Sequence, residues 1–210
     1  MSIANKAFSI LKRDIVLFFS QLITSVIIAR KLGPEMVGTW VILSMIPTYA
    51  ESFGRIKFDI AAVYFLGKKK YSIGEVVLTL NLLAVIFSAL TVIIILWQFD
   101  WLYGLLFSKS TFDASYMLYF ILLQIPLTYL YMNYSYLLLH KEDTKTYNWM
   151  IIIKSLVFLV VSIVLILVFD LGLWAVVGAS VLSIFIGLFY GAYKLGPTER
   201  PAHIINIPLI

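Results

Sequence analysis

Cysteine is absent from the 210 residues, which excludes disulfide bonds and thiolate chemistry. The two histidines, His140 and His203, stand too far apart to form a metal-binding motif. The sequence shows no nucleophile beside a histidine, no carboxylate pair without a basic neighbour, and no glycine-rich phosphate loop. We therefore expect a protein that is not an enzyme, with no catalytic residue, no cofactor and no metal.

Charge is also scarce. Charged residues make up 13% of the chain, about half of the roughly 25% typical of soluble domains, whereas hydrophobic residues make up 62%. Stretches of about 20 nearly uncharged residues recur, and each is long enough to cross a hydrocarbon core of ~30 Å as a helix. Helices satisfy their backbone hydrogen bonds internally, as lipid requires. The sequence therefore predicts an all-α integral membrane protein.

The apolar stretches predict six transmembrane helices. Their expected ranges are residues 15–32, 36–58, 76–97, 117–139, 149–169 and 173–193. These spans would form one six-helix bundle over residues 1–195, followed by an irregular cytoplasmic tail over residues 196–210. At ~1.5 Å per residue from Met36, Glu51 would lie roughly 22 Å into the membrane, in its inner half.

Basic residues predict the orientation of this bundle. If the N-terminus is inside, the cytoplasmic segments contain most of the lysines and arginines outside the predicted spans, and the link after the fifth span contains none. Because cytoplasmic loops of membrane proteins are enriched in these residues, we expect both termini inside and a location in the cytoplasmic membrane. The net charge of +5 reflects this asymmetry, and we expect no nucleic-acid partner.

The second predicted span has one polar line. At about 100° per residue, its polar side chains fall within a stripe roughly 100° wide. These are Ser44, Thr48, Glu51, Ser52, Arg55 and Asp59. Glu51 with Arg55, and Arg55 with Asp59, are i,i+4 pairs of opposite charge, which lowers the cost of holding them out of bulk water. Pro47 should kink this helix.

Two interpretations of this line remain open. The span could end near Phe53, with the charges simply beginning a cytoplasmic loop. Alternatively, the helix could continue to Leu66, with its polar line facing a water-filled cavity. We adopt the second interpretation because the line starts at Ser44, well before any loop.

Other helices carry similar polar residues. The fourth span has Gln124, Thr128, Tyr131 and Ser135 at helical spacing, and the first has Gln21, Thr24 and Ser25. Such residues either form hydrogen bonds between helices or line a cavity. Lys154 in the fifth span either extends to the inner surface or faces the same cavity.

Together these residues predict a cavity that attracts anions. Its basic residues would be Arg30, Arg55, Lys57 and Lys154, and its uncharged polar residues Gln21, Gln124, Thr128 and Tyr131. Guanidinium groups suit a phosphate or pyrophosphate because they bind pairs of oxygens. Glu51 and Asp59 would hold Arg55 in place or take part in ion or proton coupling.

Residues 29–40, ARKLGPEMVGTW, resemble the junction between the first two helices of polysaccharide flippases. These are the O-antigen and teichuronic-acid-type exporters of the multidrug/oligosaccharidyl-lipid/polysaccharide superfamily. ESFGRIKFDIAAVYFLGKKK (residues 51–70) is similar to that family's second-helix ending, and FDLGLWAVVGASVLS (residues 169–183) to its sixth-helix start, where Gly172, Gly178, Ala179 and Ser180 would allow close packing.

The resemblance implies alternating-access transport of polyprenyl-pyrophosphate-linked oligosaccharide, with Arg30 aligned through the motif. It covers only the first of the family's two six-helix lobes. Three explanations of the missing lobe remain open: the chain is a truncated product, it pairs with a separately encoded lobe, or it forms a homodimer. Membrane lipids are its other expected partners. Two other functions remain open: a cation-coupled drug antiporter of the same superfamily, and a non-transporting scaffold of polysaccharide assembly, whose polar lines would be fully hydrogen-bonded.

Overall fold

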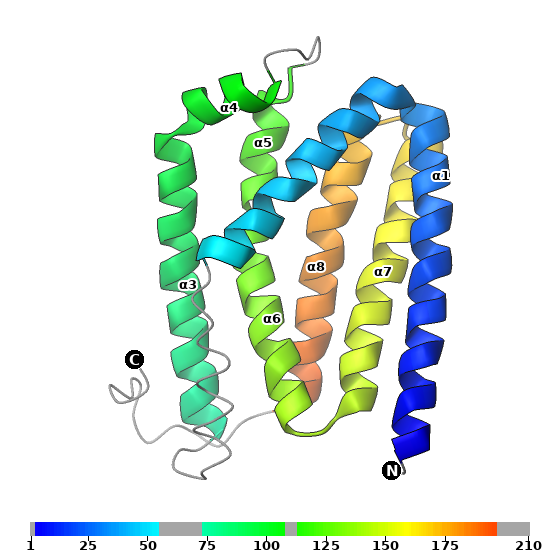
Figure 1. The fold of residues 1–210 in the computed structure, drawn as a ribbon, viewed down its shortest axis with the longest axis vertical. Helices are drawn as coiled ribbons and strands as arrows, with labels where there is room; N and C mark the ends of the chain where they lie inside the picture. Colours follow the sequence, from blue (N-terminus) through cyan, green and yellow to red (C-terminus); the bar gives the residue numbers. More distant parts are fainter. Residues whose placement is uncertain (1–2, 55–72, 108–112, 197–210) are drawn as a thin grey trace.

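The computed structural model describes residues 3–54, 73–107 and 113–196, and its regular structure over these ranges is helical (Figure 1). The elements in chain order are α1 (Ile3–Tyr49), the π-helix η1 (Ala50–Gly54), α3 (Ile73–Trp97), α4 (Phe99–Phe107), α5 (Ser115–Leu122), α6 (Gln124–His140), α7 (Thr144–Leu167) and α8 (Leu173–Leu195). The fold is therefore all-helical, as the sequence predicts.

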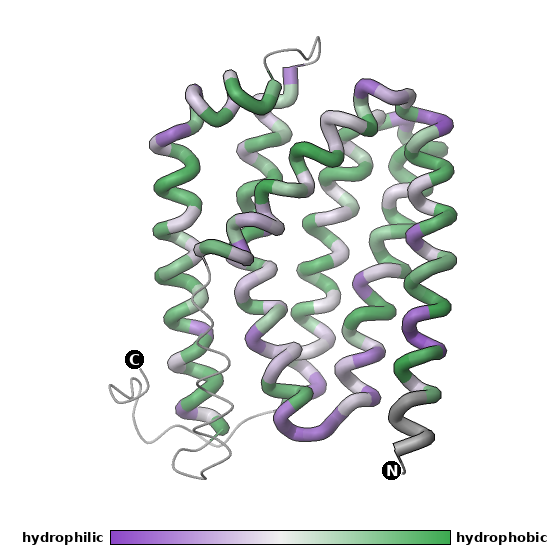
Figure 2. Tube along the Cα trace, in the orientation of Figure 1, coloured by the Kyte–Doolittle hydropathy of each residue, from purple (hydrophilic) through white to green (hydrophobic). Residues whose placement is uncertain are grey.

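The composition of these helices suits a membrane. Five helical segments among the described residues are long and apolar enough to cross one. The first of them, Phe8–Gly54, contains the predicted span 15–32 and the part of the predicted span 36–58 that the structure describes. Hydrophobic residues make up most of each helix, while hydrophilic ones lie at the two ends of the bundle and at several positions within the helices (Figure 2). The chain is a multi-pass membrane protein. Which end faces the cytoplasm remains a prediction.

α1 consists of two limbs joined at Gly33. Gly33 has φ 76° and ψ 171°, a left-handed φ that favours glycine, and Pro34 follows it as a residue suited to a helix start. The first limb covers residues 3–32 and the second limb residues 34–49. Figure 1 shows the first limb along one side of the bundle and the second limb crossing obliquely toward α3. Because of this tilt, the separation of Glu51 from Met36 along the long axis of the bundle is smaller than their separation along the helix, from which its depth was predicted.

The remaining helices form the body of the bundle. α7 packs against the first limb of α1 on one side and against α8 on the other, while α6 packs against α8 and α3. One core cluster includes Leu43, Ile125, Tyr129 and Val177, which are fully buried. α5 and α6 share one axis that is interrupted at Leu123.

This interruption has a local cause. Pro126 has no backbone N–H, and its ring crowds the carbonyl of Leu122, four residues earlier. The chain responds with a tighter turn, in which the N–H of Leu123 donates to the carbonyl of Phe120 at 3.2 Å. The predicted span 117–139 is therefore two helices in series.

α4 lies between the predicted spans 76–97 and 117–139, where the sequence analysis placed no helix. Aromatic rings hold it in place: Phe99 stacks on Tyr119 with centroids 4.3 Å apart and on Tyr103 at 5.9 Å. The hydroxyl of Tyr103 donates to Asp113 at 3.0 Å and accepts from the N–H of Ala114 at 3.2 Å. The Asp113 carboxylate also accepts hydrogen bonds from Ser115. These hydrogen bonds, and to a lesser extent the one from Tyr103, lower the pKa of Asp113.

Close helix packing on α8 differs in part from the expectation, because Ala179 and Ser180 are buried but Gly178 meets no neighbour. A Cβ atom on Gly178 would meet no atom within 4 Å, so this glycine does not mark a close approach. At Gly187 a Cβ would lie 3.0 Å from the Tyr131 ring, and at Gly191 it would lie 2.7 Å from the Met150 sulfur. Gly187 and Gly191 form a Gly-x-x-x-Gly pair, which is typical of close contacts between membrane helices.

Asp143 caps the N-terminus of α7 and gives a pH-dependent prediction. Its side chain accepts from the N–H of Thr146 at 3.0 Å, and hydrogen bonding with Thr146 lowers the pKa of the carboxyl. A lowered folded-state pKa contributes stability above the unfolded pKa of about 3.9 that is lost as pH falls through the folded value. We expect Asp143→Ala to lower the free energy of unfolding by ~1 kcal/mol at pH 7.

This difference should shrink below about pH 4, because the protonated wild-type carboxyl also loses its cap. Thermal unfolding of purified protein in detergent at pH 7 and pH 3.5 measures both values. Asp143→Asn is the control, since asparagine caps helices without titrating. An Ala penalty that persists unchanged at pH 3.5 would contradict the role of the charge.

Candidate functional site

A cavity of about 340 Å³ lies among both limbs of α1 and helices α6, α7 and α8. Its lining comprises Leu17, Gln21, Trp40, Ser44, Thr48, Gln124, Ile151, Lys154, Ser155, Phe158, Ser180, Ser183 and Ile184. More than half of these side chains carry a polar atom. This content distinguishes the cavity from two apolar grooves, one beside the second limb and one between α3 and α5.

Several sequence-predicted residues meet at this cavity. Gln21 from the first limb, Gln124 from α6 and Lys154 from α7 all line it. Ser44 and Thr48, the first residues of the polar line on the second limb, line it as well. Polar residues predicted on three helices, α1, α6 and α7, therefore contribute to one polar interior.

Lys154 provides the cation of this cavity. It lies ten residues after Thr144, or about 15 Å along α7. Its Nζ is 5.1 Å from the centroid of the Tyr131 ring, a cation–π contact. Within the described ranges, the amine makes no hydrogen bond and no ion pair, although the Glu51 carboxylate interacts with it electrostatically. Lys154 therefore faces the cavity, with free N–H donors.

The hydroxyl groups of the cavity have already used their hydrogens. Ser44 donates to the carbonyl of Val41 at 2.8 Å, and Thr48 to that of Ser44 at 2.9 Å. On α8, Ser180 donates to Val177 and Ser183 to Ser180, at 2.7 and 2.8 Å. A hydroxyl oxygen has two lone pairs, so each of these groups can still accept a hydrogen bond from a ligand.

Gln124 adds a further acceptor. Its side-chain oxygen Oε1 is buried and accepts no hydrogen bond from the described residues. Buried polar atoms nearly always have a partner, from protein, water or a ligand. Gln124 thus marks a place where the cavity lacks a donor.

Other predicted residues are not brought to the cavity. Arg30 is exposed and lies close to the Gly33 turn, at the opposite end of the bundle from the start of α7 (Figure 1). Thr128 is half-buried on α6 and is not among the lining residues. Arg55, Lys57 and Asp59 lie outside the described residues, and so do the predicted ion pairs of Arg55.

Sequence reasoning missed several lining residues. Trp40 stacks on Phe158 with centroids 6.1 Å apart, which joins the second limb to α7 beside the cavity. Ser180 and Ser183 are three positions apart and so share one face of α8, a helical spacing that could have identified them.

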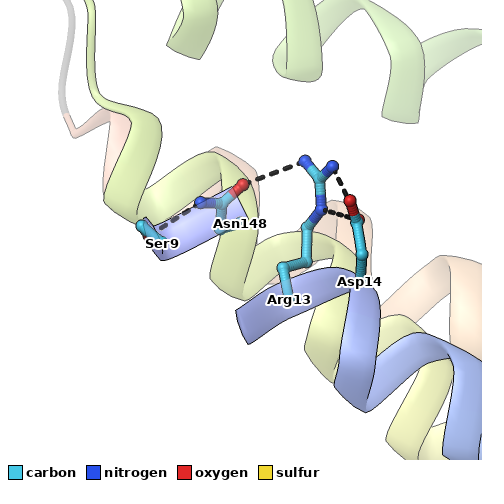
Figure 3. Close-up of polar contacts among 4 residues, drawn as sticks. All are labelled: Ser9, Arg13, Asp14 and Asn148. Atoms are coloured by element: carbon cyan, nitrogen blue, oxygen red, sulfur yellow. Dashed lines mark hydrogen bonds and ion pairs between the residues drawn. The ribbon is translucent and has the colours of Figure 1, made fainter. Parts of the chain in front are cut away.

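Polar contacts also attach the first limb to α7 (Figure 3). Arg13 donates to Asn148 at 3.0 Å and forms an ion pair with Asp14 at 2.8 Å, while Asn148 donates to Ser9 at 2.9 Å. Nearer the cavity, Ser20 and Ser155 share a hydrogen bond. Hydrogen bonds of this kind hold membrane helices together, because lipid provides little hydrophobic drive for helix association.

Comparisons place the fold among known proteins. A crystal structure of the Vibrio cholerae MATE transporter VcmN in the bent form matches the chain with a TM-score of 0.63 and 19% sequence identity. The match covers 97% of this chain and 48% of the transporter, so the chain spans about half of that protein's length. No protein-family model and no curated protein matches the sequence. The chain therefore has a fold that resembles one half of a MATE transporter.

Proposed function

We propose that the chain is one lobe of a transporter that moves polyprenyl-pyrophosphate-linked oligosaccharide across the cytoplasmic membrane by alternating access. The observation that carries this proposal is the Lys154 amine, free of described ion-pair partners, in a cavity whose other polar groups are hydroxyls and amides. Such a lining suits an anionic, hydroxyl-rich ligand. A second six-helix lobe would complete the pathway, and in a membrane that contains only this chain that lobe would be a second copy.

Within this proposal the functional groups have separate roles. The cavity residues Gln21, Gln124 and Lys154 contact the sugars, while Arg30 and Arg55 attract the pyrophosphate. Glu51 acts on the cavity through its charge, as its interaction with Lys154 indicates. Membrane lipids surround the apolar grooves and the exposed faces of α3 and of the first limb of α1.

The second candidate function is export of cationic compounds by ion-coupled antiport. It is favoured by the likeness to a MATE transporter and by the Glu51 carboxylate near the cavity. The described lining of the cavity contains Lys154 and no carboxylate, which gives a cationic ligand no partner there. A scaffold role is less well supported, because the Gln124 oxygen has no hydrogen bond from the described residues.

A flipping assay tests the proposal directly. The full chain is reconstituted into vesicles, with a fluorescent polyprenyl-pyrophosphate disaccharide in one sample and a fluorescent lipophilic cation in the other. We expect faster transbilayer movement of the pyrophosphate lipid than in protein-free vesicles, and no accelerated cation uptake. Accelerated cation uptake without lipid movement would instead support the antiporter.

Thiol labelling provides a prediction on the charge of the cavity. Because the chain has no cysteine, Ser44→Cys introduces a single thiol at the cavity wall. A cavity of one sign raises the local concentration of the opposite ion by at least about tenfold. We expect an anionic methanethiosulfonate to label Ser44→Cys about tenfold faster than a cationic one, after correction with a neutral reagent.

The charge of Lys154 should cause this preference. In Ser44→Cys/Lys154→Met protein, the ratio of anionic to cationic labelling is expected to fall to about one or below. Ser44→Cys/Lys194→Met is the matched control, since Lys194 lies at the end of α8, outside the cavity lining. A faster reaction with the cationic reagent in Ser44→Cys protein would favour the antiporter.

A further inference from the structure

α4 lies across one end of the bundle instead of along it (Figure 1). It follows directly on α3, which ends at Trp97, and the N–H of Leu102 donates to the carbonyl of Gln98 at the junction. At ~1.5 Å per residue, the 25 residues of α3 cover roughly 37 Å, more than a hydrocarbon core of ~30 Å. α4 therefore begins at the level where the hydrocarbon gives way to headgroups.

One face of α4 is fixed to the protein by aromatic rings. Phe99, Tyr103 and Phe107 are each four positions apart, with ring centroids 5.9 Å and 5.2 Å from one ring to the next. Phe99 also stacks on Tyr119 of α5, and Phe107 is buried. These contacts fix the rotation of α4 about its own axis, so the directions of its other side chains follow from their spacing.

Two edges of α4 differ in polarity. Leu102 and Leu106 line the apolar groove beside the second limb, together with Ile94 and Ile95 of α3. Asp100 is exposed, and at ~100° per residue it lies about 160° around the helix from Leu102. α4 thus has an apolar edge toward the groove and a charged edge on nearly the opposite side.

Between these edges runs an exposed apolar stripe, the α4 stripe, formed by Trp97, Trp101 and Leu105. The exposed fractions of these side chains are 81%, 65% and 62%. The stripe continues the exposed apolar face of α3, on which Ile93 is 60% exposed. Tryptophan is enriched at membrane–water interfaces, because its indole combines a large apolar ring with one N–H donor. A stripe of this composition, between an apolar and a charged edge, matches that boundary.

We propose that the α4 stripe binds the boundary between the headgroups and the acyl chains of one membrane leaflet, so that α4 is an interfacial helix. Trp101 and Leu105 insert beside the first acyl carbons, the indole N–H donates to lipid oxygens, and Asp100 faces water. A protein partner fits less well, because Asp100 borders the stripe and charged residues are depleted from the centres of protein interfaces. This placement of α4 holds whatever the chain transports.

Spin labels report the surroundings of each position in the full-length chain. Because the chain has no cysteine, Ile93→Cys, Asp100→Cys, Trp101→Cys and Leu105→Cys each introduce a single thiol for a nitroxide label. The proteins are reconstituted into vesicles of phosphatidylcholine and phosphatidylglycerol. Collisions of the label are then measured with oxygen, which concentrates in hydrocarbon, and with nickel ethylenediaminediacetate, which stays in water.

The ratio of oxygen to nickel collision rates should follow the depth of each position. We expect this ratio at Trp101→Cys and Leu105→Cys to exceed that at Asp100→Cys by at least about threefold, with Ile93→Cys higher still. A ratio as low as that of Asp100→Cys would place the α4 stripe in water, and one as high as that of Ile93→Cys would place it in the hydrocarbon core. Slow collisions with both reagents would mean that protein, such as a second copy, covers the stripe. Each of these three results would overturn the proposal.

Tryptophan fluorescence tests the same contact with the native side chain in place. Wild-type protein and Trp101→Phe are compared in phosphatidylcholine brominated either near the acyl carbonyl or near the chain end. We expect the fluorescence that Trp101→Phe removes to be quenched more strongly by the first lipid. Trp40→Phe is the matched control, because Trp40 stacks on Phe158 at the cavity and its contribution should be quenched little by either lipid. A Trp101 contribution that neither lipid quenches would show that the stripe does not touch the bilayer.

Discussion

Lys154→Met is expected to reduce export of lipid-linked oligosaccharide by about thirtyfold or more. In the proposed complex the Lys154 amine pairs with an anionic group of the substrate. Removing one partner of such a desolvated, hydrogen-bonded charge pair costs roughly 2–5 kcal/mol, and each 1.4 kcal/mol is about a tenfold change in the equilibrium constant. Methionine keeps most of the unbranched stem, which packs close to Gly187 of α8. The loss should therefore reflect the missing charge and not a cavity in the core.

Surface polymer measured in cells that depend on this protein for export would test the expectation. The amount of each variant in the membrane fraction is measured in parallel, to separate transport from insertion. Lys154→Arg retains the charge and should keep part of the activity, whereas Lys194→Met should behave as wild type. Normal export by membrane-inserted Lys154→Met protein would remove Lys154 from substrate binding.

The helical character of the fold could be predicted because lipid leaves few alternatives. Uninterrupted apolar stretches determine where helices cross, and the Gly33–Pro34 pair marks the turn between the first two. Breaks inside the helices were harder to predict. Pro126 does signal the interruption at Leu123, but a proline in a membrane helix is often tolerated. α4 depends on the stacking of Phe99 with Tyr119, a contact between separate elements that no local pattern reveals.

The candidate site was predictable only in part. Helical spacing identified Ser44, Thr48 and Gln124, because one polar line on an apolar helix points toward other protein. Lys154 was ambiguous, since an apolar helix such as α7 gives no preferred face from which to infer where the amine points. Arg30 follows from a motif, and a motif gives no distance to the cavity. Tilt of the second limb could not be inferred either, because it depends on contacts with α3 and α6.

One of these contacts occurs at Gly54, the last described residue of η1. A Cβ atom there would lie 2.5 Å from both the Thr91 Oγ1 and the Tyr129 hydroxyl, well inside normal contact distance. The same Tyr129 hydroxyl donates to the carbonyl of Ala50 at 2.6 Å. The π-turn after Pro47 is thus fixed against α3 and α6, and this contact sets the direction in which the second limb presents Ser44 and Thr48.

Gly54→Ala is therefore expected to lower the free energy of unfolding by ~1–3 kcal/mol, the usual cost of overpacking. Gly38→Ala is the matched control, because a Cβ there meets no atom within 4 Å and alanine is the better helix former by about 1 kcal/mol. Denaturant unfolding in mixed detergent micelles measures both. Tyr129→Phe removes one of the two overlapping oxygens and also the hydrogen bond to Ala50, so we expect Gly54→Ala to cost less in a Tyr129→Phe background than in the wild type. Equal stability of the two glycine variants would mean that the second limb is not held at Gly54, and the alignment of its polar line with the cavity would then need another cause.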